Sequence, residues 1–140
     1  MSYTTSAAVE KVPLETPIRH DFVDNAGFAG LSRRTNDAGL ERTFAVNDLA
    51  MFRLTLGLLP RLQESGPARI VNISIDTCRI AKLDLDGRQL ERDDTMMKAY
   101  GQSKLAMLCF TLELARLLAS GAGSAGVRAN AARAGANESG

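Results

Sequence analysis

Tryptophan is absent from this 140-residue chain, histidine occurs once, at His20, and cysteine occurs twice, at Cys78 and Cys109. Two cysteines at irregular spacing are too few for a disulfide framework or a cysteine-based zinc site. One histidine gives a histidine-based catalytic triad or a histidine-rich metal site too little to build from. We therefore expect no metal ion. The low cysteine content favours a reducing, cytoplasmic location.

The chain also lacks a long apolar run and an excess of charge of one sign. No stretch of about 18 uninterrupted apolar residues occurs, so no membrane span is expected. The 17 basic and 16 acidic side chains are well mixed and give a net charge of +1, which argues against a nucleic-acid partner. The first six residues do not resemble a secretory signal. The remaining composition, 45% apolar, is that of one domain with a real core.

Strand-like and helix-like segments alternate along the chain after residues 1–17, which we predict to be a loosely ordered arm. The predicted strands are residues 20–24, 69–75 and 127–132, and the predicted helices are about 39–64 and 99–119. The acidic, irregular segment 76–98 is predicted to be a surface excursion. Such alternation implies parallel strands joined by right-handed crossovers, with ligands beyond the carboxyl ends of the strands.

Each predicted helix carries an apolar stripe. In the first helix, which we interpret as core or subunit interface, the stripe is Leu40, Phe44, Leu49, Phe52, Leu56 and Leu59. In the second helix it is Leu105, Leu108, Leu112, Ala115 and Leu118. Cys109, in the second helix, is interpreted as a small core residue.

Tyr100 and Lys104 lie four residues apart where the second helical pattern begins. Residues at this spacing share one face of a helix. A nearby positive charge favours the ionised form of a phenol, and a tyrosine tuned in this way can act as a general acid or base. A chance pairing on an ordinary helix remains the alternative for this motif taken alone.

Four segments in order resemble the short-chain dehydrogenase/reductase family, over roughly residues 18–139. Asp24-Asn25-Ala26-Gly27 resembles the Asn-Asn-Ala-Gly turn after the family's fourth strand. The other three matches are Phe44–Leu49, around the family's catalytic Asn (here Asn47), Arg69–Ser74, the fifth strand, and Ala99–Ala106, the Tyr-x-x-x-Lys helix. The segments Glu41–Asn47, Leu58–Leu62 and Phe110–Arg116 resemble the retinol-dehydrogenase-like branch of the family.

The resemblance implies an α/β fold, a partial Rossmann-like doubly wound domain in residues 18–140. Its three parallel strands would be the family's fourth to sixth, joined by crossover helices. It implies hydride transfer between NAD or NADP and a small alcohol or carbonyl substrate. Tyr100 would give or take the hydroxyl proton, Lys104 would hold the nicotinamide ribose, and Asn47 would anchor a water. The cofactor contacts carried over from the motifs are Asn25, Ala26, Gly27, Tyr100, Lys104 and Gly135.

The chain departs from the family at the catalytic serine. The family's strand usually ends in two serines, the second of which is catalytic, whereas here the pair reads Ser74-Ile75. Tyr100 follows Ile75 by 25 residues, the usual spacing of the branch, so Ile75 occupies the catalytic position. Ser74 is a weak candidate, because alternate residues of a strand point to opposite faces. Asp24 also replaces the first Asn of the turn and adds a charge.

The family's glycine-rich phosphate cradle has no counterpart where it is expected. Only 24 residues precede Asn25 and none is glycine, whereas a βαβ unit needs about 30. The segment Gly121–Gly126 fits Gly-x-Gly-x-x-Gly but follows a helix and leads into a strand. We therefore predict a connection in which Gly121 caps the helix. Ala134 replaces the proline that usually precedes the glycine at Gly135.

Two functions therefore remain open. The first is an NAD(P)-dependent oxidoreductase. The second is a catalytically inactive, truncated relative that persists as an association module or an unstable fragment. We expect little or no activity from these residues alone, because the cradle and the serine are missing. The predicted strand at residues 20–24 would have an unpaired edge, and the two helices could pair with a second copy to form a homo-oligomer.

Overall fold

The computed structural model describes residues 21–75, 78, 81–84, 95–121 and 126–133, and the predicted arm at residues 1–17 lies outside them. In the described part, three strands form one parallel sheet in the order β1-β2-β3. The strands are β1 (Asp21–Asp24), β2 (Arg69–Ser74) and β3 (Arg128–Arg133). The predicted parallel sheet is confirmed, and every strand boundary falls within one residue of its prediction.

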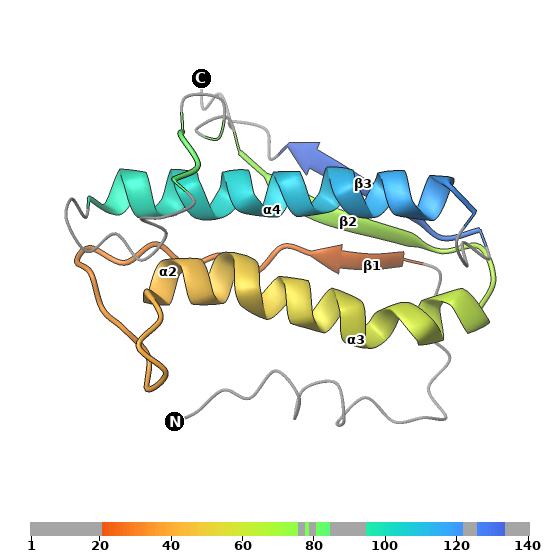
Figure 1. The fold of residues 1–140 in the computed structure, drawn as a ribbon, viewed down its shortest axis with the longest axis horizontal. Helices are drawn as coiled ribbons and strands as arrows, with labels where there is room; N and C mark the ends of the chain where they lie inside the picture. The colour runs from red at the N-terminus through yellow and green to blue at the C-terminus, as the bar shows by residue number, and fades with distance from the viewer. Residues whose placement is uncertain (1–20, 76–77, 79–80, 85–94, 122–125, 134–140) are drawn as a thin grey trace, which may run out of the picture.

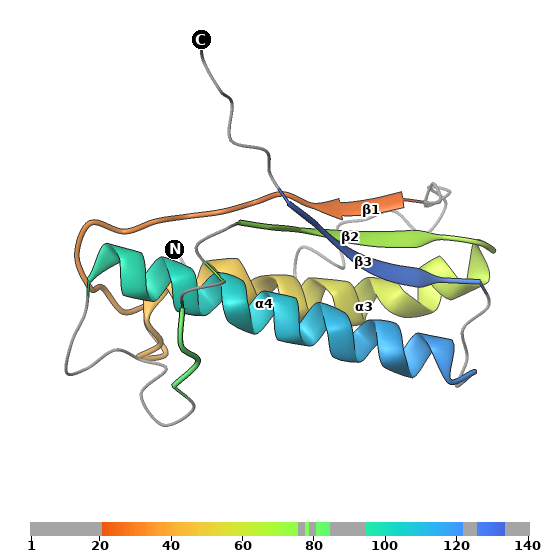
Figure 2. The same cartoon turned by 90° about the horizontal axis from the view of Figure 1, so that it is seen from above.

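Helical segments connect the strands. A run consisting of α2 (Arg42–Phe44), a π-helical turn η1 (Ala45–Leu49) and α3 (Ala50–Glu64) joins β1 to β2, and α4 (Met96–Ala119) joins β2 to β3. Figure 1 shows α3 and α4 side by side along the strands, and Figure 2 shows both on the same side of the sheet. Two successive right-handed crossovers in one direction along a sheet place their helices on one face. The described residues thus supply one of the two helical layers of a doubly wound fold.

The helix ends are set by capping side chains. The first helical run begins at Arg42 rather than near residue 39, because the Glu41 carboxylate accepts hydrogen bonds from the Thr43 and Phe44 backbone N–H groups at 2.8 and 2.7 Å. The α4 helix begins earlier than predicted, because the Thr95 hydroxyl accepts from the Lys98 N–H at 3.3 Å. Beyond α4, Gly121 adopts a φ of 84°, which confirms its predicted capping role.

The hydrophobic core lies between the helices and the sheet. Leu62 and Ile70 are completely buried, and the buried cluster around them consists of Leu58, Ala68, Leu114, Leu118, Val127 and Ala129. The predicted stripes lie only partly in the core, because Phe52, Leu56 and Leu112 are exposed. Cys109 is also exposed, so its interpretation as a core residue was wrong. Apolar residues stand on both the inner and the outer side of each helix, and spacing alone did not distinguish the two sides.

A polar pair occupies part of the inner side of α4. The Thr111 hydroxyl donates to the Met107 carbonyl at 2.8 Å and accepts from the Asn72 side-chain N–H at 2.7 Å. Both residues are at most 1% exposed. Buried polar groups are tolerated when they are hydrogen-bonded, which explains how the Thr111 hydroxyl and the Asn72 side-chain N–H can lie in the interior, while the Asn72 Oδ1 has no partner among the described residues.

The other face of the sheet is not covered by a helix of the described part (Figure 2). Burial alternates along β2, where Ile70, Asn72 and Ser74 are buried beneath the helices and the residues between them are not. On β1, Val23 remains 56% exposed. The described chain therefore buries one side of its sheet far better than the other.

Candidate active site

The candidate site lies at the carboxyl ends of the strands, toward the end of the molecule at which α4 begins (Figure 1). Tyr100 and Lys104 stand one turn apart in the first half of α4. A Cβ atom built on Gly27 would lie 3.8 Å from the Tyr100 hydroxyl and 3.8 Å from the Lys104 ammonium. The phenol and the ammonium therefore share one face of α4, as the helical spacing predicts, and both lie close to the turn that follows β1.

Lys104 is a buried lysine, with 4% of its surface exposed. Its Nζ donates to the backbone carbonyl of Ile73, in the central strand, at 3.1 Å. Burial lowers the pKa of Lys104, because the charged ammonium loses solvation, and the negative charge of Asp24 partly opposes this effect. Local sequence did not predict this burial, since the predicted role placed Lys104 in contact with a ligand.

Asp24, the last residue of β1, is also buried, with 5% of its surface exposed. Burial raises the pKa of its carboxyl group, while the positive charge of Lys104 and a hydrogen bond from the Ala26 backbone N–H act in the opposite direction. Its Oδ1 atom has no hydrogen-bond partner among the described residues. The carboxyl group at this turn is thus enclosed at the end of β1.

Asn47 lies in the π-helical turn η1 and is completely buried. Its Oδ1 accepts from the Phe28 backbone N–H at 2.7 Å, and its Nδ2 donates to the Phe28 carbonyl at 2.8 Å and to the Ser103 hydroxyl at 3.1 Å. Ser103 in turn donates to the Tyr100 carbonyl at 2.8 Å. Asn47 therefore ties the loop after β1 to the helix that carries Tyr100. Single π turns inside helices are frequent at functional sites.

The other predicted site residues that the structure describes lie at the end of β2 and in the turn after β1. Ser74 is buried at the end of β2, and its hydroxyl lies 3.5 Å from the Cys78 thiol. Ile75 follows it and is half-buried. Asn25 and Ala26 are exposed in the turn after β1. Gly135 lies outside the described residues, so its predicted cofactor contact stays a prediction.

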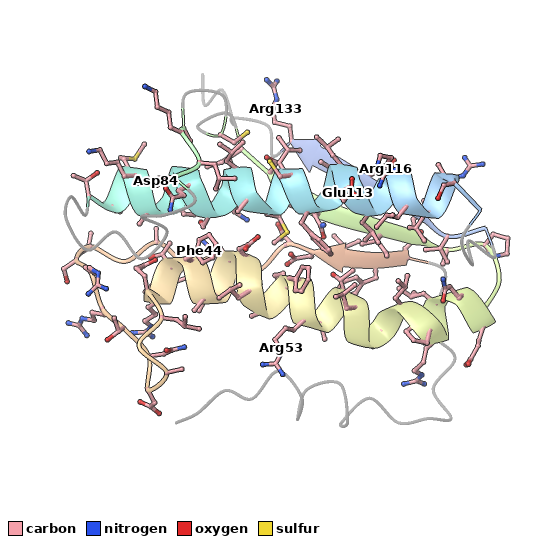
Figure 3. The ribbon with its side chains drawn as sticks, viewed as in Figure 1. Phe44, Arg53, Asp84, Glu113, Arg116 and Arg133 are labelled. Carbon is pink, nitrogen blue, oxygen red and sulfur yellow. The ribbon has the colours of Figure 1, made fainter. Side chains whose placement is uncertain are left out.

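The acidic excursion comes close to α4 at one described residue. The Asp84 backbone N–H donates to the Gln102 side-chain oxygen at 3.4 Å, and Figure 3 shows Asp84 beside the first half of α4. Farther along α4, Glu113 and Arg116 form an exposed ion pair at 2.7 Å. No cluster of three or more potential metal ligands occurs in the described ranges. In the same ranges, no helix is long and apolar enough to cross a bilayer.

Comparison with known proteins decides the family. The model of the short chain dehydrogenase family matches residues 4–139. The chain belongs to this family. It is 40% identical to retinol dehydrogenase 12 of Mus musculus over 112 residues, which are 80% of this chain and 35% of that protein. It is 39% identical to polyprenol dehydrogenase of Homo sapiens over 116 residues, 80% of this chain and 34% of that protein.

Solved structures share the fold. The crystal structure of an uncharacterised protein from Mycobacterium paratuberculosis superposes with a TM-score of 0.78 and 28% identity, covering 96% of this chain and 47% of that one. The NADP active-site complex of Pseudomonas aeruginosa RhlG superposes with a TM-score of 0.56 and 24% identity, covering 80% of this chain and 40% of that one. This short-chain dehydrogenase chain spans about a third of the curated relatives' length and about half of the solved structures' length.

Sequence reasoning missed two residues of this site. Ser103 lies inside the Tyr-x-x-x-Lys motif, but its hydroxyl role became visible only once Asn47 was placed beside it. Asp24 was noted as a charge in the turn, but its burial could not be predicted from the local sequence. The replacement of the family's Asn by Asp24 was the available signal.

The residues present fit one end of a nicotinamide dinucleotide. The Lys104 ammonium carries three N–H donors and gives one to Ile73. With the Tyr100 hydroxyl and the side-chain-free position at Gly27, it forms a polar surface suited to ribose hydroxyls. A pyrophosphate finds no matching cradle in the described part. The α2 N-terminus is already capped by the Glu41 carboxylate, and that of α4 by Thr95.

Proposed function

We propose that this chain carries the proton-transfer half of an NAD(P)-dependent oxidoreductase site that interconverts an alcohol and a carbonyl compound. The observation that supports this most strongly is the convergence of the Tyr100 hydroxyl and the Lys104 ammonium on Gly27. The curated relatives are named as dehydrogenases of retinol and polyprenol, two alcohols, which agrees with this reaction class. The particular alcohol is not part of the proposal.

In this reaction the chain's own residues handle the proton. Oxidation of an alcohol removes a hydride from carbon and a proton from oxygen, and the nicotinamide cofactor, when bound, takes the hydride. Tyr100 accepts the proton from the alcohol oxygen and returns it in the reverse direction. Lys104 offers N–H donors to the ribose. Asn47 keeps Tyr100 in register with the loop after β1 through Ser103.

The experiment uses nicotinamide mononucleotide, which contains the nicotinamide and its ribose but lacks the adenosine half. We expect a nuclear magnetic resonance titration of the ¹⁵N-labelled chain to shift the backbone amides of Gly27 and Lys104. Adenosine monophosphate, as the control ligand, should leave both unchanged. If nicotinamide mononucleotide moves neither amide at millimolar concentration, the proposal is wrong for this chain.

A second measurement addresses the missing pyrophosphate cradle. We expect NADH or NADPH at millimolar concentration to raise the melting temperature by no more than one degree, because stabilisation follows RT ln(1 + [L]/Kd) and a weakly held ligand adds little. A larger rise would show that residues outside the described ranges hold the dinucleotide. Where turnover of an alcohol is detectable, Tyr100→Phe should abolish it, and unchanged turnover would remove Tyr100 from its proposed role.

Association of the chain with a second copy is the other candidate. The specific observation in its favour is the exposed apolar surface on the helices, with Phe52 and Leu56 on α3 and Leu112 and Leu117 on α4, between 39% and 61% exposed. Phe52 packs edge-to-face on Phe110 at 4.9 Å between ring centroids, so the apolar surface continues from one helix to the other. Sedimentation velocity should show a dimer for the wild-type chain and a monomer for Leu112→Glu. A monomeric wild-type chain would exclude this candidate.

A further inference from the structure

A cavity lies at the end of the sheet opposite to the candidate active site, where the strands begin and α3 and α4 end (Figure 1). Its volume is about 510 Å³, and its lining residues are Asp21, Pro67, Ala68, Arg69, Gly126 and Arg128. β2 has six residues and rises by about 3.3 Å per residue, so about 16 Å separate the two ends. The ribose and the pyrophosphate of a dinucleotide are directly bonded. This cavity is therefore not the missing cradle of a cofactor bound at Gly27.

Two arginines stand side by side in this cavity. Arg69, the first residue of β2, and Arg128, the first residue of β3, are register partners in the parallel sheet. The residues that follow them, Ile70 and Ala129, are buried beneath the helices, so both arginines belong to the open face of the sheet. Both are exposed, and neither forms an ion pair with another described residue. Like charges at facing positions of neighbouring strands repel each other.

The base of the cavity is held by two backbone contacts. The Arg128 N–H donates to the Ala68 carbonyl at 2.9 Å, which joins the starts of β2 and β3. A Cβ atom built on Gly126 would lie 3.2 Å from the Pro67 Cα, and Gly126 has a φ of 84°, so glycine allows the residues that lead into the two strands to pack closely. The two arginines therefore project from a backbone that is already in place and does not need to be ordered by a ligand.

One carboxylate borders the two arginines. Asp21, the first residue of β1, is the register partner of Arg69 on the side away from Arg128. It is exposed and forms no ion pair with a described residue. Two guanidinium groups and one carboxylate give the lining a net charge of +1. The positive charge is therefore concentrated between Arg69 and Arg128.

We propose that Arg69 and Arg128 form a binding site for a phosphate group, carried by inorganic phosphate or by a phosphorylated small molecule. A guanidinium group presents its N–H donors in a planar fork that matches the spacing of phosphate oxygens. A phosphate carries more negative charge than one carboxylate and has enough oxygens to accept from both arginines. It thereby offsets the repulsion between them. The cavity volume lies in the range of small-molecule sites.

The experiment titrates inorganic phosphate into the full ¹⁵N-labelled chain at constant pH and ionic strength and follows the side-chain Nε–Hε resonances of the arginines. We expect the resonances of Arg69 and Arg128 to shift and to reach saturation at millimolar phosphate. The resonance of Arg53, an exposed arginine of α3, and the backbone amides of Gly27 and Lys104 should stay in place. Acetate at the same ionic strength should cause no saturating shift. Shifts that do not saturate, or equal shifts with acetate, overturn the proposal.

Variants assign the binding to this cavity. Arg69→Gln and Arg128→Gln should each raise the dissociation constant for phosphate by about tenfold, because each removes one set of charge-assisted hydrogen bonds. Arg53→Gln is the matched control and should leave the dissociation constant unchanged. Asp21→Asn should lower it, because the variant removes the neighbouring negative charge. Circular dichroism checks that each variant is folded. If neither arginine variant weakens binding, or if Asp21→Asn weakens it, the phosphate does not bind between Arg69 and Arg128.

A second titration distinguishes the two sources of the phosphate group. Glycerol 3-phosphate carries the same group on a small organic molecule. If it binds more tightly than inorganic phosphate and shifts the same two arginine resonances, the cavity takes a phosphorylated small molecule. Equal or weaker binding assigns the site to inorganic phosphate. If glycerol 3-phosphate shifts other arginine resonances instead, the proposal is overturned.

Discussion

The Asn47 side chain holds both backbone polar groups of Phe28, accepting from its N–H at 2.7 Å and donating to its carbonyl at 2.8 Å. The Asn47 side chain thus makes the two hydrogen bonds that a neighbouring strand would make. In the described part of the chain, no strand pairs with Phe28. The third contact of Asn47, to Ser103, makes the position of this loop depend on α4. The buried amide of Asn47 therefore ties this loop to the helix that carries Tyr100.

Replacement of Asn47 by Ala should lower the free energy of unfolding by about 1–3 kcal/mol, because the partly buried Phe28 N–H and carbonyl lose their hydrogen-bond partner. Urea denaturation measures the effect. Asn130→Ala, on the exposed surface of β3, is the control and should change the free energy by less than about 0.5 kcal/mol. If Asn47→Ala lowers the free energy of unfolding no more than Asn130→Ala does, Asn47 does not hold the loop through Phe28.

Replacement of Gly27 by Ala should separate stability from ligand binding. The added methyl would make ordinary contacts of 3.8 Å with Tyr100 and Lys104, so it does not clash, but it fills the space between them. We expect the free energy of unfolding to stay unchanged or to rise by up to about 1 kcal/mol, because alanine lowers the conformational entropy of the unfolded chain. We also expect the amide shifts caused by nicotinamide mononucleotide to be lost.

Gly39→Ala is the matched comparison for Gly27→Ala. Gly39 has a φ of 76° and open space around it, so this variant should lose stability and keep the amide shifts. If both variants kept the amide shifts, Gly27 would not border the ligand.

The stability of the chain should depend on pH through Asp24. Because its folded-state pKa is raised, the folded chain binds the Asp24 proton more tightly than the unfolded chain does. The free energy of unfolding of the wild type, relative to Asp24→Asn, is then highest below about pH 4, the ordinary value for aspartate, and falls as the pH rises through the folded-state pKa. Urea denaturation of both proteins between pH 3.5 and 7 measures this difference. A difference that grows with pH would mean that the carboxylate is stabilised by folding.

Replacement of Leu62 by Ala should lower the free energy of unfolding by about 2–5 kcal/mol, since a completely buried side chain leaves a cavity between α3 and β2. Leu31→Ala, at a position 90% exposed, should have little effect. Thermal or urea denaturation distinguishes them, and equal effects would show that the core is not packed as described.

Most of the fold followed from local sequence, and the errors have physical reasons. The β-branched run Arg69–Ser74 and the bounded segment at Asp21–Asp24 were placed to within a residue, because strand propensity and turn residues agree there. The start of α4 was missed because Met96, Met97 and Lys98 extend the helix without an apolar period, and only the Thr95 cap marks the boundary. The inner face of α4 was misjudged because Thr111 is buried through a hydrogen bond to a strand 39 residues away.

The sequence predicted only those features of the site that helical spacing and the family motifs indicate. Helical spacing brought Tyr100 and Lys104 to one face, and the family motif singled out Asn47. The burial of Lys104 and Asp24 depends on how α4 packs over the strand ends, which no local pattern encodes. The assigned catalytic roles, the NAD(P) cofactor and the cytoplasmic location stay predictions.

The helices of the described part cover only one face of the sheet, which affects the solvent exposure of its strands. Parallel strands are normally shielded on both faces, yet Val23 on β1 is more than half exposed here. Deuterium should therefore enter the amides of β1, an outer strand, sooner than those of β2, which is hydrogen-bonded on both sides. Any neighbour that shields the open side would slow that entry and raise the melting temperature together, without touching Tyr100.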